Sequence, residues 1–207
     1  MIYPTIAKID QATVLANGFT VSFWAKLPSS QTNFTSLFSI NGAIGDIFSL
    51  VDIAYRKNGD VFDFDGSLTN VDGGGTHSTG FASNVQGPTN SGFSFTGTEW
   101  ALITMTYDDA TRKISYYGNG VKVPGDYTVP TSVIAASPSQ FELITGAVQQ
   151  VSFGTLSLNP PFTSGPAIDA SYQGAGLIGS LDDVRLFDRA LSATDIADLY
   201  TLGTQHR

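Results

Sequence analysis

Apolar and polar residues alternate along residues 19–27, which read Phe-Thr-Val-Ser-Phe-Trp-Ala-Lys-Leu. The apolar side chains of this run occupy every second position, namely Phe19, Val21, Phe23, Ala25 and Leu27. A period of two residues is typical of a β-strand that packs one face on a core. Less regular runs predict further strands at residues 35–40, 47–55, 61–64, 99–107, 114–117, 121–123, 141–145, 151–158 and 179–187.

A tight turn is predicted at Asn119-Gly120, between two of these apolar runs. Asn-Gly is the strongest short signal of a β-hairpin, because both central positions of the favoured turn need a positive φ. The runs before and after this dipeptide therefore belong to one antiparallel meander.

One segment near the end of the chain has a helical pattern. Ser192 is a suitable N-cap, and Asp195 three residues later makes a weak form of the capping box. Leu191 and Ile196 are placed for a hydrophobic staple across the start of the helix. Gly203 is expected to end it as the C′ residue. These signals predict a short helix over about residues 192–202.

The composition narrows the possible partners. The formal net charge is −8, and the ten basic residues form no long cluster, which disfavours a nucleic-acid partner. Without cysteine there is no disulfide framework and no cysteine-based zinc site. No apolar stretch is long enough to insert in a membrane, and no signal peptide is visible at the start. No linker divides the sequence, so we expect one domain over residues 1–207.

Three segments, taken in order, carry a family resemblance. They are residues 19–26, residues 99–121 with Trp100 near the start and Asn-Gly near the end, and residues 179–192 ahead of the helix. This ordered set resembles the three-motif branch of the laminin-G-like, concanavalin A-like lectin superfamily. The resemblance implies an all-β, two-sheet antiparallel jelly-roll sandwich, often with one bound calcium, and a role in glycan or protein adhesion. Residues 65–97 depart from the family pattern, and a ligand loop could lie there.

Catalytic signals are weak. A glycosidase needs two carboxylates on either side of the scissile bond, about 5–10 Å apart. The only glutamates, Glu99 and Glu142, are far apart in sequence, and the Glu-x-Asp-x-x-Glu motif of glucanases with this fold is absent. No Gly-x-Ser-x-Gly motif occurs either. We therefore expect no enzyme activity, and a polysaccharide hydrolase or lyase is the least favoured class.

The paired carboxylates Asp182 and Asp183 are the most conspicuous charged feature. In an unbulged strand they point to opposite faces, so they cannot form a close catalytic dyad. Asp183 can then pair with Arg185 on its own face, whereas Asp182 aims at an apolar face and needs a partner such as calcium. A chain rich in Asp and without Cys suits calcium better than zinc. The predicted metal ligands are Asp182, Asp183 and Asp65.

The predicted ligand-binding residues are polar or aromatic side chains in loop segments: Asp72, His77, Asn90 and Tyr172. Glycan sites usually combine an aromatic platform with polar planar groups. Trp24 and Trp100 lie in apolar strands, so we interpret them as structural.

Two functions remain open at this point. The first is a carbohydrate-binding or adhesion module with a structural calcium, which binds a glycan or a protein surface outside the cell. The alternative is a structural protein of a viral or filament assembly, such as a phage head-decoration, tail or fibre protein, that is located on the virion surface as part of a homo-oligomer. The Met start and the missing signal peptide favour the alternative, while a module cut from a secreted protein would look the same.

Overall fold

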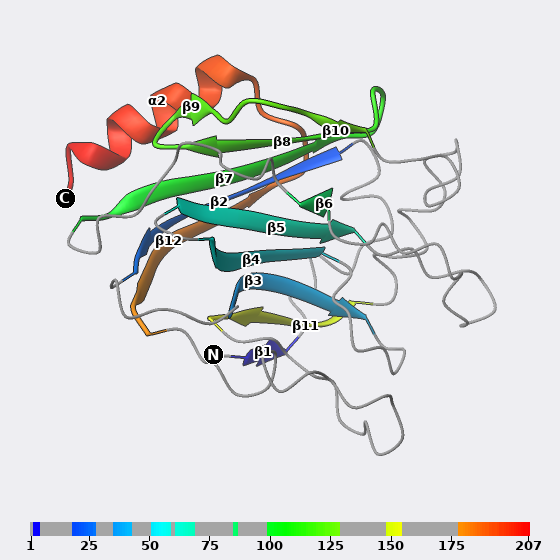
Figure 1. Ribbon diagram of the computed structural model, residues 1–207, viewed down its shortest axis with the longest axis horizontal. Helices are drawn as coiled ribbons and strands as arrows, with labels where there is room; N and C mark the ends of the chain where they lie inside the picture. Colours follow the sequence, from blue (N-terminus) through cyan, green and yellow to red (C-terminus); the bar gives the residue numbers. More distant parts are fainter. Residues whose placement is uncertain are drawn as a thin grey trace.

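The computed structural model describes residues 2–4, 18–27, 35–42, 51–58, 61–68, 85–86, 99–128, 148–154 and 178–207. These residues form antiparallel β-strands and one C-terminal helix (Figure 1). The predicted all-β class is therefore confirmed. The described part of the chain contains no helix that is both long and apolar enough to cross a membrane.

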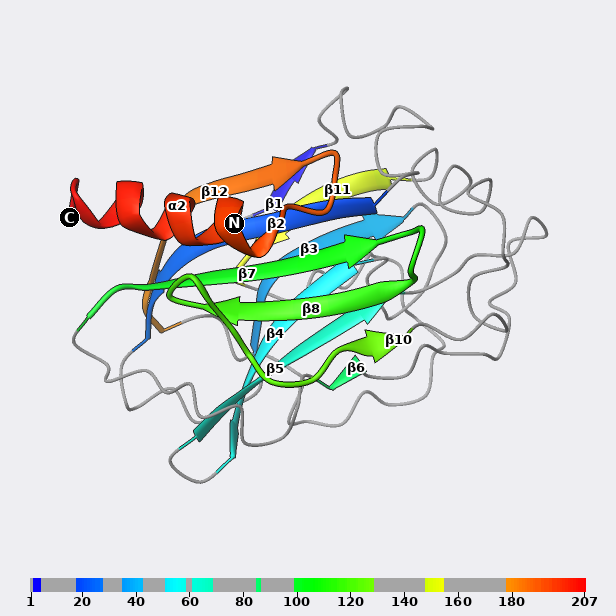
Figure 2. The ribbon, with the colours of Figure 1, turned by 90° about the horizontal axis from the view of Figure 1, so that it is seen from above.

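The strands make two sheets, and the second sheet lies over the first (Figure 2). The order in the first sheet is β1 (Ile2–Pro4), β11 (Val148–Phe153), β3 (Thr35–Gly42), β4 (Val51–Asn58), β5 (Val61–Leu68) and β6 (Val85–Gln86). The order in the second sheet is β10 (Tyr127–Thr128), β8 (Lys113–Gly118), β7 (Ala101–Asp108), β2 (Gly18–Lys26) and β12 (Ser180–Phe187), with β9 (Val121–Lys122) beside β8.

The core follows the alternation of the β2 sequence. Phe19, Val21 and Phe23 are fully buried, and they lie opposite buried residues of β7. The first sheet contributes buried side chains of its own, among them Leu37 and Ile53. The strand predicted from strict alternation is thus confirmed, with its apolar face in the interior.

The polar face of β2 is also buried. Thr20, Ser22 and Trp24 are at most 2% exposed, because the C-terminal helix and its leading segment cover that side of the sheet (Figure 2). The buried hydroxyls are hydrogen-bonded. Thr20 Oγ1 donates to the carbonyl of Arg189 and accepts from the N–H of Leu191, both at 2.8 Å. The covering segment is therefore fixed to β2 by polar contacts as well as by packing.

The predicted turn between β8 and β9 is confirmed. Asn119 and Gly120 have φ values of 51° and 79°. Asn119 Oδ1 also accepts a hydrogen bond from the backbone N–H of Leu102 at 2.9 Å, and the backbone N–H of Asn119 donates to the Leu102 carbonyl. The turn is thereby tied to the start of β7, which adds a tertiary role to its local one.

Other strand predictions differ at their limits. The run predicted at 47–55 corresponds to β4, which extends to Asn58, and the run at 61–64 extends to Leu68 as β5, while residues 47–50 lie outside the described part of the chain. Strands β1, β6 and β10 were not predicted, because each has only two or three residues. The strand expected at 141–145 lies outside the described residues.

The helix α2 (Ala193–Thr204) starts as predicted. Asp195 N–H donates to Ser192 Oγ at 3.1 Å, and Ser192 N–H donates to Asp195 Oδ2 at 3.0 Å, which completes the capping box. Leu191 and Ile196 are buried in one cluster with Tyr117. This apolar contact fixes the start of α2 against β8.

The predicted end of the helix at Gly203 is wrong. Gly203 lies inside α2, and the C-cap is Gln205. A Cβ atom at position 203 would come within 2.5 Å of Trp24 Cζ2, so the glycine allows the helix to approach the indole ring. Its role is close packing, which a sequence pattern cannot distinguish from a helix stop.

Candidate functional site

A β-bulge shapes the part of β12 that carries the paired carboxylates. Asp182 lies opposite Trp24 and Arg185 lies opposite Ser22, so three steps along β12 match two steps along β2. Asp183, inside the bulge, has a φ of 50°. The unbulged strand assumed from the sequence is therefore wrong, and Asp182 and Arg185 share the outer face with Trp24.

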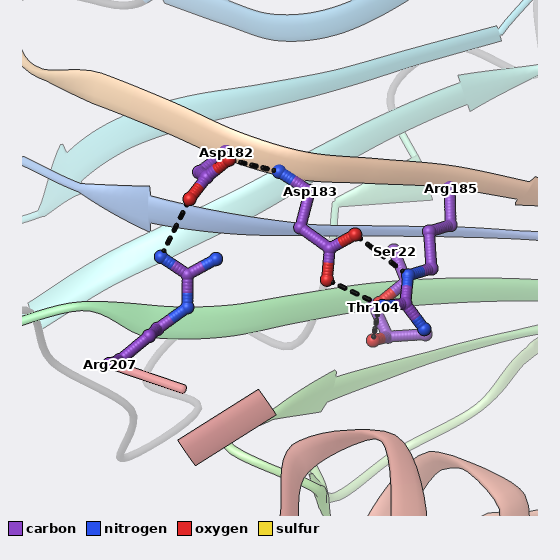
Figure 3. A network of polar contacts seen from close by, with 6 residues as sticks. All are labelled: Ser22, Thr104, Asp182, Asp183, Arg185 and Arg207. Atoms are coloured by element: carbon purple, nitrogen blue, oxygen red, sulfur yellow. Dashed lines mark hydrogen bonds and ion pairs between the residues drawn. The ribbon is translucent and has the colours of Figure 1, made fainter. Parts of the chain in front are cut away.

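The environment of Asp182 also differs from the expectation. Its side chain is 59% exposed instead of aiming at an apolar face. Asp182 Oδ1 accepts a hydrogen bond from the N–H of Asp183 at 2.8 Å, and Asp182 Oδ2 lies 3.0 Å from Nη1 of Arg207 (Figure 3). An arginine and a backbone N–H are thus the partners of this carboxylate.

The ion pair between Asp183 and Arg185 is confirmed. Arg185 donates from Nε to Asp183 Oδ1 at 2.8 Å and from Nη2 to Oδ2 at 2.7 Å (Figure 3). This two-point geometry holds both side chains over the sheet, where Ser22 and Thr104 share a buried hydroxyl hydrogen bond of 3.0 Å. Both charged side chains are more than one third exposed, so the pair contributes about 1 kcal/mol at most.

Beside this pair lies an arginine that contacts both tryptophans of the chain. The guanidinium carbon of Arg207 is 4.6 Å from the ring centroid of Trp24 and 4.8 Å from that of Trp100. We call Trp24, Trp100 and Asp182 the cation cage. The Arg207 side chain is only 16% exposed, so the cage encloses most of it.

The helix α2 positions this arginine. Tyr200 stacks on Trp24 with ring centroids 5.7 Å apart, and Gly203 packs against the same indole. Arg207 lies three residues beyond Thr204, the last residue of α2, and its guanidinium lies against the same indole on which Tyr200 stacks. Arg207 was not predicted as a site residue, because its contacts, Trp24, Trp100 and Asp182, lie far away along the chain and no local pattern indicates them.

A second charged cluster lies at the other side of the sheet. Asp126 is 2.6 Å from Lys122 Nζ and 3.9 Å from Lys113 Nζ, and Ser115 Oγ donates to it at 2.7 Å. The hydrogen bond from Lys122, with help from Ser115, lowers the pKa of Asp126 below its usual range. The same hydrogen bond raises the pKa of Lys122. This cluster of one carboxylate and two ammonium groups joins β8, β9 and the segment that leads to β10.

The predicted metal ligands come from different parts of the fold. Asp182 and Asp183 lie in β12 of the second sheet, whereas Asp65 lies in β5 of the first sheet, opposite Ala54 and Gln86. Calcium prefers several carboxylate or carbonyl oxygens around it. Asp182 and Asp183 in β12 already pair with Arg207 and Arg185, and these arginines would have to move away for a cation to bind. Within the described residues, no three acidic or histidine side chains group in a way that could hold a metal ion.

The predicted ligand-binding residues Asp72, His77, Asn90 and Tyr172 lie outside the described residues, as does Glu142. Of the carboxylates that were considered for catalysis, Glu99 is exposed next to the cation cage. Asp182 and Asp183 are each engaged by an arginine. At this place in β12 the two carboxylates therefore have arginines as counter-ions.

The two antiparallel sheets and the helix that covers one of them define a β-sandwich protein of the lectin type. The sequence matches the concanavalin A-like lectin/glucanases superfamily (Laminin_G_3) over residues 5–197, and the chain belongs to this superfamily. The resemblance inferred from the three sequence segments is thereby confirmed. A search of curated protein sequences finds no match.

Solved structures share the fold at low sequence identity. A native heptameric SAP-like pentraxin from Limulus polyphemus has a TM-score of 0.59 and 14% identity, over 89% of this chain and 70% of that chain. Domain 4 of AbnA, an extracellular arabinanase from Geobacillus stearothermophilus in complex with arabinotriose, has a TM-score of 0.54 and 17% identity, over 89% of this chain and 66% of that chain. The binding domain of botulinum neurotoxin DC in complex with SialylT has a TM-score of 0.54 and 14% identity, over 97% of this chain and 38% of that chain.

Proposed function

We propose that this protein is a non-catalytic binding module that recognises carbohydrate and serves in adhesion. The observation that carries the proposal is the state of the paired carboxylates in a chain of the lectin superfamily. Asp182 and Asp183 each pair with an arginine instead of being arranged for acid–base chemistry. This pairing supports a binding role rather than catalysis.

The similar structures support a binding role. Domain 4 of the arabinanase was solved with arabinotriose, and the neurotoxin domain is a binding domain solved with SialylT. Both proteins are similar to this chain in fold only, so the sugar class is open. We keep Asp72, His77, Asn90 and Tyr172 as the predicted contacts with the glycan.

A glycan array that includes arabino-oligosaccharides and sialylated glycans tests this function. We expect saturable binding to at least one glycan, with competition by the free oligosaccharide. Tyr172→Ala and Asn90→Ala should reduce binding, whereas Asp188→Asn, a change on the exposed segment after β12, should leave it unchanged. If no glycan is retained by the folded protein, the carbohydrate proposal is wrong.

The bound glycan also tests the absence of catalysis. We expect no new reducing ends and no unsaturated products when the protein is incubated with any polysaccharide that it retains. Turnover that disappears in an Asp→Asn variant, with the fold intact, would instead establish a hydrolase or lyase.

A structural calcium ion is the other component of the proposal. It would act on stability, because a ligand that binds only the folded state raises the melting temperature. We expect calcium to raise Tm relative to chelator, and Asp182→Asn or Asp65→Asn to reduce that rise. An identical Tm in calcium and in chelator would contradict the metal prediction.

The alternative role in a viral or filament assembly stays a prediction. It requires self-association, which size-exclusion chromatography with light scattering measures directly. A monomer that binds sugar favours the module, whereas a stable oligomer without glycan binding favours the assembly protein.

A further inference from the structure

The cation cage already holds a guanidinium group, so its geometry shows which ligand it accepts. We propose that the cage of Trp24, Trp100 and Asp182 is a binding site for an arginine side chain of a partner protein. Arg207 occupies this site within the chain and acts as a displaceable competitor. The inference goes beyond the proposed glycan binding, since it concerns a different class of ligand.

The chemistry of the cage favours arginine over other cations. The faces of indole rings attract cations, and tryptophan does so most strongly among aromatic residues. Two rings at 4.6 and 4.8 Å from the guanidinium carbon are both within the range of this attraction. A planar, weakly hydrated guanidinium stacks on aromatic faces, and a carboxylate orients it through its N–H groups. Asp182 supplies that carboxylate, 3.0 Å from Nη1 of Arg207.

The site is open on the side of its carboxylate. The Asp182 side chain is 59% exposed, although the Arg207 side chain is only 16% exposed. An arginine that arrives from solvent therefore meets the counter-ion first and then the two rings. Glu99, exposed and directly before Trp100, adds a further negative charge nearby. With a net charge of −8, the protein attracts basic partners as a whole.

Displacement of Arg207 leaves the helix in place. Arg207 lies beyond the last helical residue, Thr204, and its own contacts are the two rings and Asp182. The helix is docked independently by buried Ile196 and by the stack of Tyr200 on Trp24. A short tether gives Arg207 an effective concentration in the millimolar range or above. A partner arginine therefore succeeds when it is part of a larger interface, or when Arg207 is removed.

The chain offers a direct spectroscopic test, because its two tryptophans both belong to the cage. The full chain and its Arg207→Ala variant are titrated with N-acetyl-arginine methylamide, and tryptophan fluorescence is recorded. We expect saturable binding to Arg207→Ala, at least about tenfold tighter than to the wild type, since the tethered competitor is absent. The citrulline analogue, which has the same shape without the charge, should give no response.

Two further variants test whether the affinity for the arginine probe depends on Asp182 of the cage or on charges near it. Adding Asp182→Asn to Arg207→Ala should weaken binding by about three- to fivefold, the effect of losing one exposed charge pair. Arg185→Ala in the same background is the matched control, because Arg185 pairs with Asp183 and not with the cage. That control should leave the affinity unchanged.

A purely structural role for Arg207 gives a different result. Arg207→Ala would then melt at a lower temperature and show no saturable response to the arginine probe, which would overturn the proposal. An equal response to the citrulline analogue would overturn it as well. If Arg207→Ala does not fold, the two indole N–H signals of the wild-type protein are followed by NMR. Both must shift with excess arginine probe and not with citrulline, and the absence of such shifts refutes the site. The glycan array is independent of this result.

Discussion

Replacing Gly203 by alanine tests whether the contact between α2 and Trp24 governs how the helix docks. Intrinsic helix propensity alone predicts a gain of about 1 kcal/mol, because glycine is the less favourable residue inside a helix. The structure predicts the opposite sign. A Cβ atom at position 203 would lie 2.5 Å from Cζ2 of Trp24 and 2.8 Å from its Cε2 and Nε1.

The expected loss of stability in Gly203→Ala follows from these distances. Carbon atoms pack at about 3.5–4.0 Å, so the helix or the ring must move by about 1 Å. Overpacking of this kind costs about 1–3 kcal/mol, and the gain in helix propensity offsets about 1 kcal/mol of it. We expect a net loss of about 1 kcal/mol, which lowers Tm by about 2–4 °C in a chain of this size.

Thermal unfolding followed by circular dichroism measures this difference, with Asp198→Ala as the control for propensity at an exposed position of the same helix. In a Trp24→Phe background the indole atoms are gone, and Gly203→Ala should then stabilise the protein by up to about 1 kcal/mol. If Gly203→Ala raises Tm in the wild-type background, the close approach of α2 to Trp24 is not a constraint and the reasoning fails.

Three further changes probe other contacts. Thr20→Val leaves the Leu191 N–H and the Arg189 carbonyl without their side-chain partner. We expect the free energy of unfolding, measured by urea titration, to fall by about 2–3 kcal/mol, and an unchanged value would contradict this role of Thr20. Asn119→Ala removes the acceptor of the Leu102 N–H and should cost about 1–2 kcal/mol by the same measurement. The hydrogen bond from Lys122 is the main cause of the lowered pKa of Asp126. The ionised Asp126 therefore stabilises the folded protein above the unfolded-state pKa of about 4, and this stabilisation is lost as the pH falls through the lower folded-state pKa. The Tm difference between wild type and Asp126→Asn should therefore be largest near neutral pH and vanish in strong acid, and a difference independent of pH would refute this cause.

The features that the sequence predicts correctly are encoded locally. Alternation in β2, the Asn119-Gly120 turn and the Ser192 cap each depend on residues within a few positions of one another. The physical causes of these features do not depend on residues elsewhere in the fold. They are the alternation of side chains along a pleated strand, the need for a positive φ in the turn, and the unpaired N–H groups at the start of a helix. Such signals also carried the family resemblance.

The features that the sequence analysis missed depend on partners far along the chain. The bulge at Asp183 appears only when β12 is aligned with β2, about 160 residues earlier, and one extra residue changes which side chains share a face. Gly203 has the local pattern of a helix stop, yet its role is set by Trp24. Arg207 has no local function at all, since each of its contacts comes from a distant strand or loop residue.

The bulge in β12 has a consequence for how copies of this protein meet in solution. In the described part of the chain, β12 is the last strand of its sheet, and a regular edge strand invites hydrogen bonding with the backbone of another molecule. Here the ladder is interrupted at Asp183 and Val184, between the paired residues Asp182 and Arg185, and two carboxylates and an arginine lie at the interruption. An incoming strand would find its register broken and charges in its path. The same residues that were candidates for chemistry thus keep this edge from becoming a template for aggregation.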